Sequence, residues 1–249
     1  MKVQDIFDFL NKKYPSDNAC SFDNVGILAG DPSAEVKNVL LALDCTAEVI
    51  KSAKQHSCGL IITHHPVIFE PLKNVLAGSI VYELINNGLS VISMHTNLDV
   101  GSGGVNDSLC DALGFENYQK SAAADGYLLN IVSISPAAEP GQFAGFLKER
   151  LGGSVKYVAG KTSISRLLIC SGSGGGYLSE VIPKGCDALL TADVKHNVFL
   201  EAEHLGISLY DAGHFNTEDV VIEPLKHLLQ DKFKDIEFYS EHLTNISHI

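Results

Sequence analysis

The segment Gly59-Leu60-Ile61-Ile62-Thr63-His64-His65-Pro66 combines a short apolar run with two adjacent histidines. A run rich in β-branched residues between glycine and proline is typical of a buried strand. We therefore expect its C-terminal end to deliver His64 and His65 to the edge of a sheet, where open α/β folds place their binding sites. Neighbouring strand residues point to opposite faces, so the two histidines can serve two metal ions, or one metal and one substrate. The alternative is a pair of ordinary histidines in a surface loop.

The chain on both sides of this segment alternates between apolar runs and helical segments. Apolar runs at 39–43 and 89–94 predict two further strands, and the segments between them predict helices. Strands and helices that alternate at this spacing favour right-handed crossovers and a parallel sheet. We interpret the small-residue segment 121–126 as a joint. A second alternation follows it, with predicted strands at 127–134, 166–170, 187–190, 207–210 and 236–239 and predicted helices at 143–151, 194–204 and 217–230.

An internal repeat relates the two alternations. Segments 39–65 and 166–193 each contain an apolar strand, a turn of small residues and a helix, and then a cysteine with a threonine five residues later. We therefore predict an α/β fold built from a duplicated three-layer α/β unit. Its two similar domains would be residues 1–124 and 125–249, with a metal cleft between them. The alternative is the chance similarity that any two strand–helix–strand units share.

Histidines and carboxylates follow the predicted strands at several further points. His95 and Asp99 follow the strand at 89–94, while His214 and Glu218 follow the strand at 207–210. Imidazole and carboxylate together favour divalent ions such as zinc, iron, manganese or nickel. A mixed set with a carboxylate able to bridge is what a two-metal site needs. We predict a metal site from the joint placement of these residues, although each histidine taken singly can be structural.

The repeat also predicts residues beside the metal. It aligns Thr191-Ala192-Asp193 with the histidine turn and His95 with His214. We expect Asp193 to accept the free N–H of a ligand histidine, which fixes its tautomer. We assign His95 and His196 as candidate catalytic residues that could carry a proton. The alternatives are that Asp193 caps a helix that begins at residue 194, and that His196 is a structural histidine.

The glycine-rich stretch 172–176 is the remaining motif. It precedes a predicted helix and could bind phosphate through backbone N–H groups. It matches neither the dinucleotide fingerprint nor the P-loop. We interpret it as a close-packing turn at the domain seam, with phosphate binding as the alternative.

Composition restricts the partners and the compartment. The 249 residues include 18 Lys and Arg against 30 Asp and Glu, a formal net charge of −12. Non-specific nucleic-acid binding is disfavoured because phosphate contacts need clustered basic residues. No apolar run reaches the roughly 18 residues of a membrane span, and the amphipathic segment 1–13 is unlike a signal peptide. The six cysteines form no CxxC pair. We therefore expect a cytoplasmic protein without membrane partners.

Four motifs in order resemble one known family. They are Asp23-Asn24-Val25-Gly26, Thr63-His64-His65-Pro66, His95-Thr96-Asn97-Leu98-Asp99 and Asp211-Ala212-Gly213-His214-Phe215-Asn216-Thr217-Glu218. The chain resembles the YbgI-like, or Nif-three-like, family over essentially its whole length. Bacterial members of this family are labelled GTP cyclohydrolase 1 type 2 homologues. Phe22 stands where the family has tryptophan, so an aromatic side chain is kept.

The resemblance implies two divalent metal ions per chain, a bridging role for Glu218, and a toroidal homohexamer with its sites facing an internal cavity. The implied metal ligands are His64, His65, Asp99, His214 and Glu218. The implied activity is that of a metal-dependent hydrolase that acts on a small-molecule nucleotide or phosphoester through a metal-activated water. The alternative is a non-enzymatic protein that stores, delivers or senses metal, or that docks a partner.

Overall fold

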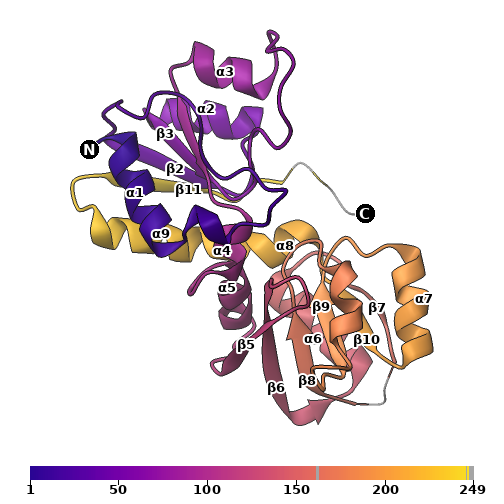
Figure 1. Ribbon diagram of the computed structural model, residues 1–249. Coiled ribbons are helices and arrows are strands. Elements are labelled where there is room, and N and C mark those ends of the chain that lie inside the picture. Colours follow the sequence, from indigo (N-terminus) through magenta and orange to yellow (C-terminus); the bar gives the residue numbers. More distant parts are fainter. Residues whose placement is uncertain (161–162, 245, 247–249) are drawn as a thin grey trace. The chain divides into compact units, whose positions relative to one another are not determined.

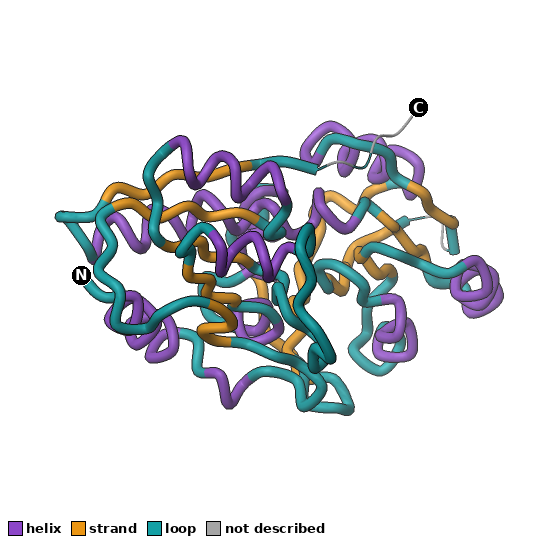
Figure 2. Tube along the Cα trace, turned by 90° about the horizontal axis from the view of Figure 1, so that it is seen from above, coloured by secondary structure: helices purple, strands orange, loops and turns teal. Residues whose placement is uncertain are grey.

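The computed structural model describes residues 1–160, 163–244 and 246, and it divides into two compact units. The first unit comprises Met1–Ser102 and Val221–Asn245, and the second comprises Gly103–Val220. This division does not coincide with the predicted halves, 1–124 and 125–249. Each unit contains one sheet with helices, and helix and strand alternate along the trace (Figure 1, Figure 2). The α/β class is therefore confirmed.

The first unit has a five-stranded sheet with mainly parallel strands. Its spatial order is β1 (Gly26–Ala29), β4 (Ser90–Ser93), β3 (Leu60–Thr63), β2 (Asn38–Ala42) and β11 (Glu237–Glu241). The strands from β4 to β11 are parallel, as the spacing predicts, while β1 runs antiparallel along β4. The last strand of the chain was predicted in the second half, but it pairs with β2 in the first unit. Its own apolar pattern does not specify which strand it pairs with.

Helices cover both faces of this sheet. Helices α2 (Ala47–Gln55) and α3 (Ile80–Asn86) pack on the face that presents Leu40 and Ile61. Helix α2 begins after Thr46, whose hydroxyl accepts the Val49 N–H and so caps the helix. Alternate strand residues such as Leu41 point to the other face and are fully buried.

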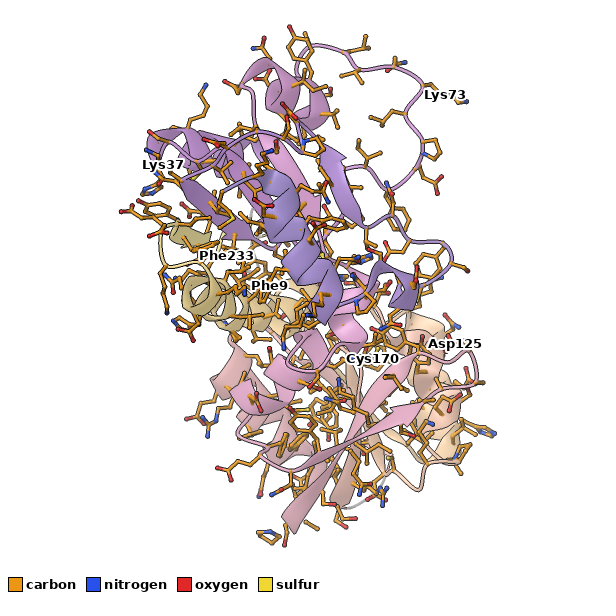
Figure 3. The ribbon with its side chains drawn as sticks, turned by 60° about the vertical axis from the view of Figure 1, so that its left-hand side comes forward. Phe9, Lys37, Lys73, Asp125, Cys170 and Phe233 are labelled. Carbon is orange, nitrogen blue, oxygen red and sulfur yellow. The ribbon has the colours of Figure 1, made fainter. Side chains whose placement is uncertain are left out.

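Helices α1 (Val3–Lys13) and α9 (Ile222–Lys232) contact strands β1, β2 and β11. Phe9 of α1 meets Phe233, just after α9, edge to face with ring centroids 5.4 Å apart (Figure 3). This contact joins the N-terminal helix to the C-terminal segment of the same unit. Within the described residues, none of the helices combines the length and apolarity needed to cross a bilayer.

The second unit has a six-stranded mixed sheet. Its order is β5 (Tyr118–Ala122), β6 (Leu128–Ala138), β8 (Ile164–Ile169), β9 (Ala188–Thr191), β10 (Ser208–Asp211) and β7 (Lys156–Val158). Strands β8, β9 and β10 are parallel, and the other three pair antiparallel. The segment 121–126, predicted as a joint, is the end of β5 and the turn of a hairpin with β6. Small residues suit both a linker and a hairpin turn, so composition does not separate them.

Two core clusters occupy the two faces of this second sheet. Helices α5 (Val105–Ala112) and α6 (Pro140–Leu151) supply one, through Leu109, Phe143 and Leu147. The 3-10 helix η2 (Gly175–Glu180) and helix α7 (His196–Leu205) supply the other, through Leu178 and Ala202. The predicted helix 217–230 consists of three pieces: α8 (His214–Glu218), the 3-10 turn η3 (Asp219–Val221) and α9. The second unit therefore has the three layers that the duplication predicts.

The strand register supports the internal repeat and corrects one part of it. Val39 pairs with Leu60 between β2 and β3, and Leu167 pairs with Ala188 between β8 and β9, as the sequence repeat aligns them. The alignment of His95 with His214 is wrong by one residue. His95 is the N-cap of the short helix α4 (Thr96–Val100), whereas His214 is the first residue of α8. Both turns have two residues, 94–95 before α4 and 212–213 before α8, so the histidine lies one position later after β10 than after β4. The spacing from histidine to carboxylate is the same in both motifs and does not reveal this difference.

Candidate metal centre

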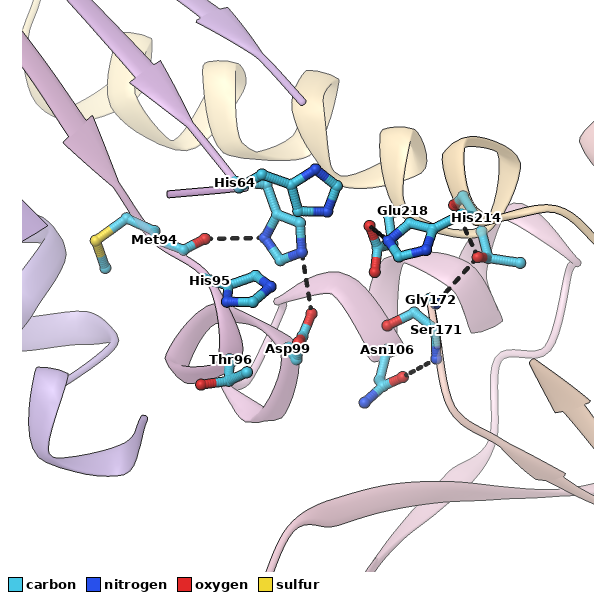
Figure 4. A network of polar contacts seen from close by, with 12 residues as sticks. His64, Met94, His95, Thr96, Asp99, Asn106, Ser171, Gly172, His214 and Glu218 are labelled. Carbon is cyan, nitrogen blue, oxygen red and sulfur yellow. Dashed lines mark hydrogen bonds and ion pairs between the residues drawn. The ribbon is translucent and has the colours of Figure 1, made fainter. Parts of the chain in front are cut away.

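Three histidines of the first unit lie together beyond the C-terminal ends of β3 and β4, and Figure 4 labels two of them, His64 and His95. His64 and His65 follow β3 directly, and His95 follows β4. One potential ligand atom from each lies within 4.8 Å of the other two. The parallel register places Thr63 beside Ser93, so the two histidine motifs leave neighbouring strands at the same edge. His95 therefore lies beside the histidine pair, while its predicted place beside a metal ion stays a prediction.

The Nδ1 atom of each of these histidines lies at hydrogen-bond distance from an oxygen. The partners are the Met94 carbonyl for His64 (2.9 Å), Asp44 for His65 (2.7 Å) and Asp23 for His95 (2.8 Å). An acceptor at Nδ1 favours the tautomer that carries its proton there, which leaves the Nε2 lone pair available for a metal ion. Each imidazole ring is therefore already oriented to bind a metal ion through Nε2.

Asp99 brings a carboxylate to the same group. It lies on α4 with 6% of its surface exposed, and its Oδ1 lies 3.4 Å from His64 Nε2. Two ligand atoms about 2.1 Å from one tetrahedral ion are separated by about 3.4 Å. His64 and Asp99 therefore have the spacing of two ligands of one divalent ion, and the imidazole and carboxylate donors fit such an ion.

Asp23, which the sequence analysis names only within a family motif, contacts this histidine group. Its Oδ1 lies beside His95 Nδ1, and its Oδ2 accepts the Thr96 N–H at 3.0 Å and the Thr96 hydroxyl. Burial raises the pKa of Asp23, but the hydrogen bonds from His95 and Thr96 outweigh this effect and lower its pKa to about 2. Asp23 therefore stays ionised and holds the His95 ring in place.

The second unit carries the other predicted pair. His214 and Glu218 occupy one face of α8, with His214 Nε2 2.9 Å from Glu218 Oε2. Glu218 is 4% exposed. Asp193 Oδ2 lies 2.7 Å from His214 Nδ1, so His214 also has an acceptor at Nδ1. This is the contact that the sequence predicts for Asp193, although its effect on metal affinity stays a prediction.

The capping alternative for Asp193 is wrong. Helix α7 begins at His196, and its N-cap is Lys195 rather than Asp193. Asp193 instead has a left-handed backbone with φ of 51° in the turn after β9. A non-glycine residue in this region is uncommon and occurs where a short polar side chain has local partners. Here the carboxylate has His214 as its partner.

His196 differs from the other predicted site residues. It is exposed at the first position of α7. Among the residues that the structure describes, no hydrogen bond or ion pair joins it to His214, Glu218 or Asp193. Its catalytic role stays a prediction to which the structure adds no contact.

The glycine-rich stretch packs closely, in accord with our preferred interpretation. Gly172 has φ of 58°, and a Cβ there would overlap Glu218 Oε1 and lie 3.3 Å from His214 Nε2. A Cβ at Gly174 would overlap Cys170 Sγ. The Thr191 hydroxyl donates to the Gly172 carbonyl and accepts the Gly174 N–H. The glycines therefore let the backbone approach the side chains of the second-unit pair.

Comparison with known proteins identifies relatives over the whole chain. The family described as Duf34/NIF3 (NGG1p interacting factor 3) matches residues 1–246. A protein of Clostridium perfringens named GTP cyclohydrolase 1 type 2 homolog is 31% identical, over 96% of this chain and 95% of its own. A protein of Campylobacter jejuni with the same name is 37% identical, over 88% of each chain. The crystal structure of a hypothetical protein from Staphylococcus aureus is 30% identical with a TM-score of 0.90, and covers 100% of this chain and 99% of its own. The chain therefore belongs to the Duf34/NIF3 family.

Proposed function

We propose that this protein binds two divalent metal ions per chain and hydrolyses a nucleotide or another phosphoester. The observation that supports this most strongly is the set of oriented histidines. In each unit, every histidine of the proposed site has an oxygen at Nδ1, so that its Nε2 is presented as a ligand atom. The proposed ligands are His64, His65, Asp99, His214 and Glu218, with Glu218 as the bridging carboxylate.

The residues of the chain would have distinct tasks. Divalent ions, when bound, lower the pKa of a coordinated water so that it can attack near neutral pH. Asp44 and Asp193 hold His65 and His214 in the ligand tautomer. His95, with its Nδ1 on the ionised Asp23, presents Nε2 to the histidine pair and is the proposed carrier of the proton that the attacking water releases.

The substrate class rests on the relatives and on charge. The curated relatives are named GTP cyclohydrolase 1 type 2 homologs, which points to a nucleotide. The net charge of −12 disfavours a long nucleic acid, because polyphosphate backbones need clustered basic residues. A small nucleotide whose phosphates contact bound metal ions avoids that requirement. We further propose a homohexamer, on the strength of the family resemblance, and a cytoplasmic location, on the strength of the sequence composition.

The decisive experiment measures metal content and turnover together. Purified protein is loaded with zinc or manganese, analysed for ions per chain, and assayed with GTP and with a generic phosphodiester. Glu218→Gln serves as the control, because it keeps the shape of the side chain but removes the bridging charge. Two ions per chain and turnover that Glu218→Gln abolishes are expected. A single ion at saturation, or turnover that survives the substitution, would contradict the proposal.

One observation favours a second candidate, a non-enzymatic metal-binding protein. The predicted second proton carrier, His196, is exposed, and among the described residues it has no hydrogen bond or ion pair with His214 or Glu218. A protein that stores, delivers or senses metal needs the ligands but no such group. Two tightly bound ions without turnover on either substrate would favour this candidate.

A further inference from the structure

Ser171, two residues after β8, has an unusual side chain. The residue is 5% exposed, and its hydroxyl oxygen is buried without a hydrogen-bond partner among the described residues. Its backbone N–H, in contrast, donates to Asn106 Oδ1 at 2.8 Å, and Asn106 is fully buried. The backbone at Ser171 is thus held by a hydrogen bond, while its hydroxyl has no partner in the described part of the chain. Burying a hydroxyl without a partner costs free energy, so a folded protein normally avoids it.

Neighbouring hydroxyls in the same loops are satisfied. Thr191 donates to the Gly172 carbonyl at 2.9 Å, and Thr217 accepts the Gly172 N–H at 3.1 Å. Other buried side chains with one unpartnered atom, such as Asn130, still bond through a second polar atom. Ser171 has only the one polar side-chain atom. The lack of a partner for the Ser171 hydroxyl is therefore not explained by a general lack of hydrogen-bond partners in these loops.

Ser171 directly precedes the glycine whose backbone packs against the proposed metal ligands of the second unit. Gly172 follows Ser171 directly, and a Cβ on Gly172 would lie 2.9 Å from Glu218 Cδ and 3.3 Å from His214 Nε2. In Figure 4, Ser171 and Gly172 lie next to Glu218 and His214. A hydroxyl can donate one hydrogen bond and accept others. Beside a metal ligand pair, the group that most needs a donor is an anionic oxygen bound at the metal.

We propose that the Ser171 hydroxyl donates a hydrogen bond to an oxyanion, such as a phosphate group, held beside His214 and Glu218. The inference rests on the proposed function, because the metal is what would hold the oxyanion there. Ser171 is then a binding residue for the phosphate of the substrate and not a metal ligand. The loop with the glycine-rich sequence contributes to phosphate binding through this side chain, while its glycines serve close packing.

The test compares Ser171→Ala with Ser173→Ala, a substitution at an exposed serine of the same loop. In the metal-free protein, Ser171→Ala should be at least as stable to urea as the wild type, because it removes an unpartnered buried polar atom. In the zinc-loaded protein, calorimetric titration with inorganic phosphate should show about tenfold weaker binding for Ser171→Ala, since a charge-assisted hydrogen bond is lost. Zinc affinity should stay within about twofold, and Ser173→Ala should match the wild type in every measurement.

The outcomes separate this inference from the proposed function. Wild-type protein that binds no metal overturns both. Zinc-loaded wild type that binds phosphate no better than Ser171→Ala, or that binds none, overturns the inference and leaves the metal site standing. A loss of zinc affinity in folded Ser171→Ala also overturns it, because the hydroxyl would then act on the metal. Ser171→Cys, with a similar shape and a weak S–H donor, provides a second variant and should weaken phosphate binding in the same direction.

Discussion

Substitution of Gly172 by alanine tests how closely the backbone packs against the proposed bridging carboxylate. The added Cβ would overlap Glu218 Oε1 and lie 2.9 Å from Glu218 Cδ. Glu218 is 4% exposed, so its carboxylate has little room to move aside. Gly172→Ala should therefore displace Glu218 and weaken metal binding. The substitution changes neither a charge nor any proposed metal ligand.

The expected effect has two parts that a control can separate. Alanine at the left-handed φ of 58° costs about 1–2 kcal/mol in free energy of unfolding, whatever its neighbours. Gly185 also has a left-handed φ, 66°, but a Cβ there would meet nothing within 4 Å. Gly185→Ala should therefore lose only the backbone part and keep its metal affinity. In addition, the metal affinity of Gly172→Ala should fall by about 10–100-fold, the range seen when the residues that hold a metal ligand in place are changed.

The assay combines urea unfolding of the metal-free variants with calorimetric titration of zinc. Gly172→Ala should be at least as destabilised as Gly185→Ala, and it alone should bind zinc more weakly than the wild type. Equal zinc affinities for the two variants would refute the reasoning. The Glu218 carboxylate would then either move without consequence or take no part in binding the metal.

Further predictions concern the oriented histidines. Asp193→Asn and Asp44→Asn should each weaken zinc binding by about 10–100-fold, measured by chelator competition, because each removes the charged acceptor at a ligand Nδ1. Far-ultraviolet circular dichroism of Asp193→Asn should be unchanged, since the N-cap position of α7 is Lys195 and not Asp193. Unaltered zinc affinity would show that these carboxylates do not support the ligands. His64→Ala and His214→Ala should lose metal but keep near-ultraviolet dichroism, because both side chains lie beyond strand ends; loss of that signal would count against the assignment. A homohexamer predicts a mass of six chains by light scattering, and a monomer at all concentrations would refute it.

Local sequence determines the central strands and the kinds of ligand. Strands β2, β3 and β4 are almost wholly buried on both faces, so their segments are predominantly hydrophobic and were predicted directly. Strands β5 and β7 were missed. Both lie at edges of their sheet and are largely exposed, so neither an apolar run nor a strict alternation marks them. The local sequence also did not predict that β11 pairs with β2, because the two strands are far apart in the chain.

Only the tertiary structure shows what orients each histidine. Asp44 follows β2 and holds the histidine after β3, its parallel neighbour, and Asp193 follows β9 and holds the histidine after β10. Asp23 precedes β1, which runs antiparallel to β4, so its start lies beside the end of β4 and the histidine there. Two parallel neighbouring strands have their C-terminal ends side by side, whereas in an antiparallel pair the N-terminal end of one strand lies beside the C-terminal end of the other. The sequence thus specifies the ligand types through local pattern, while strand order and direction determine which carboxylate supports which imidazole, because those contacts join residues far apart in the chain.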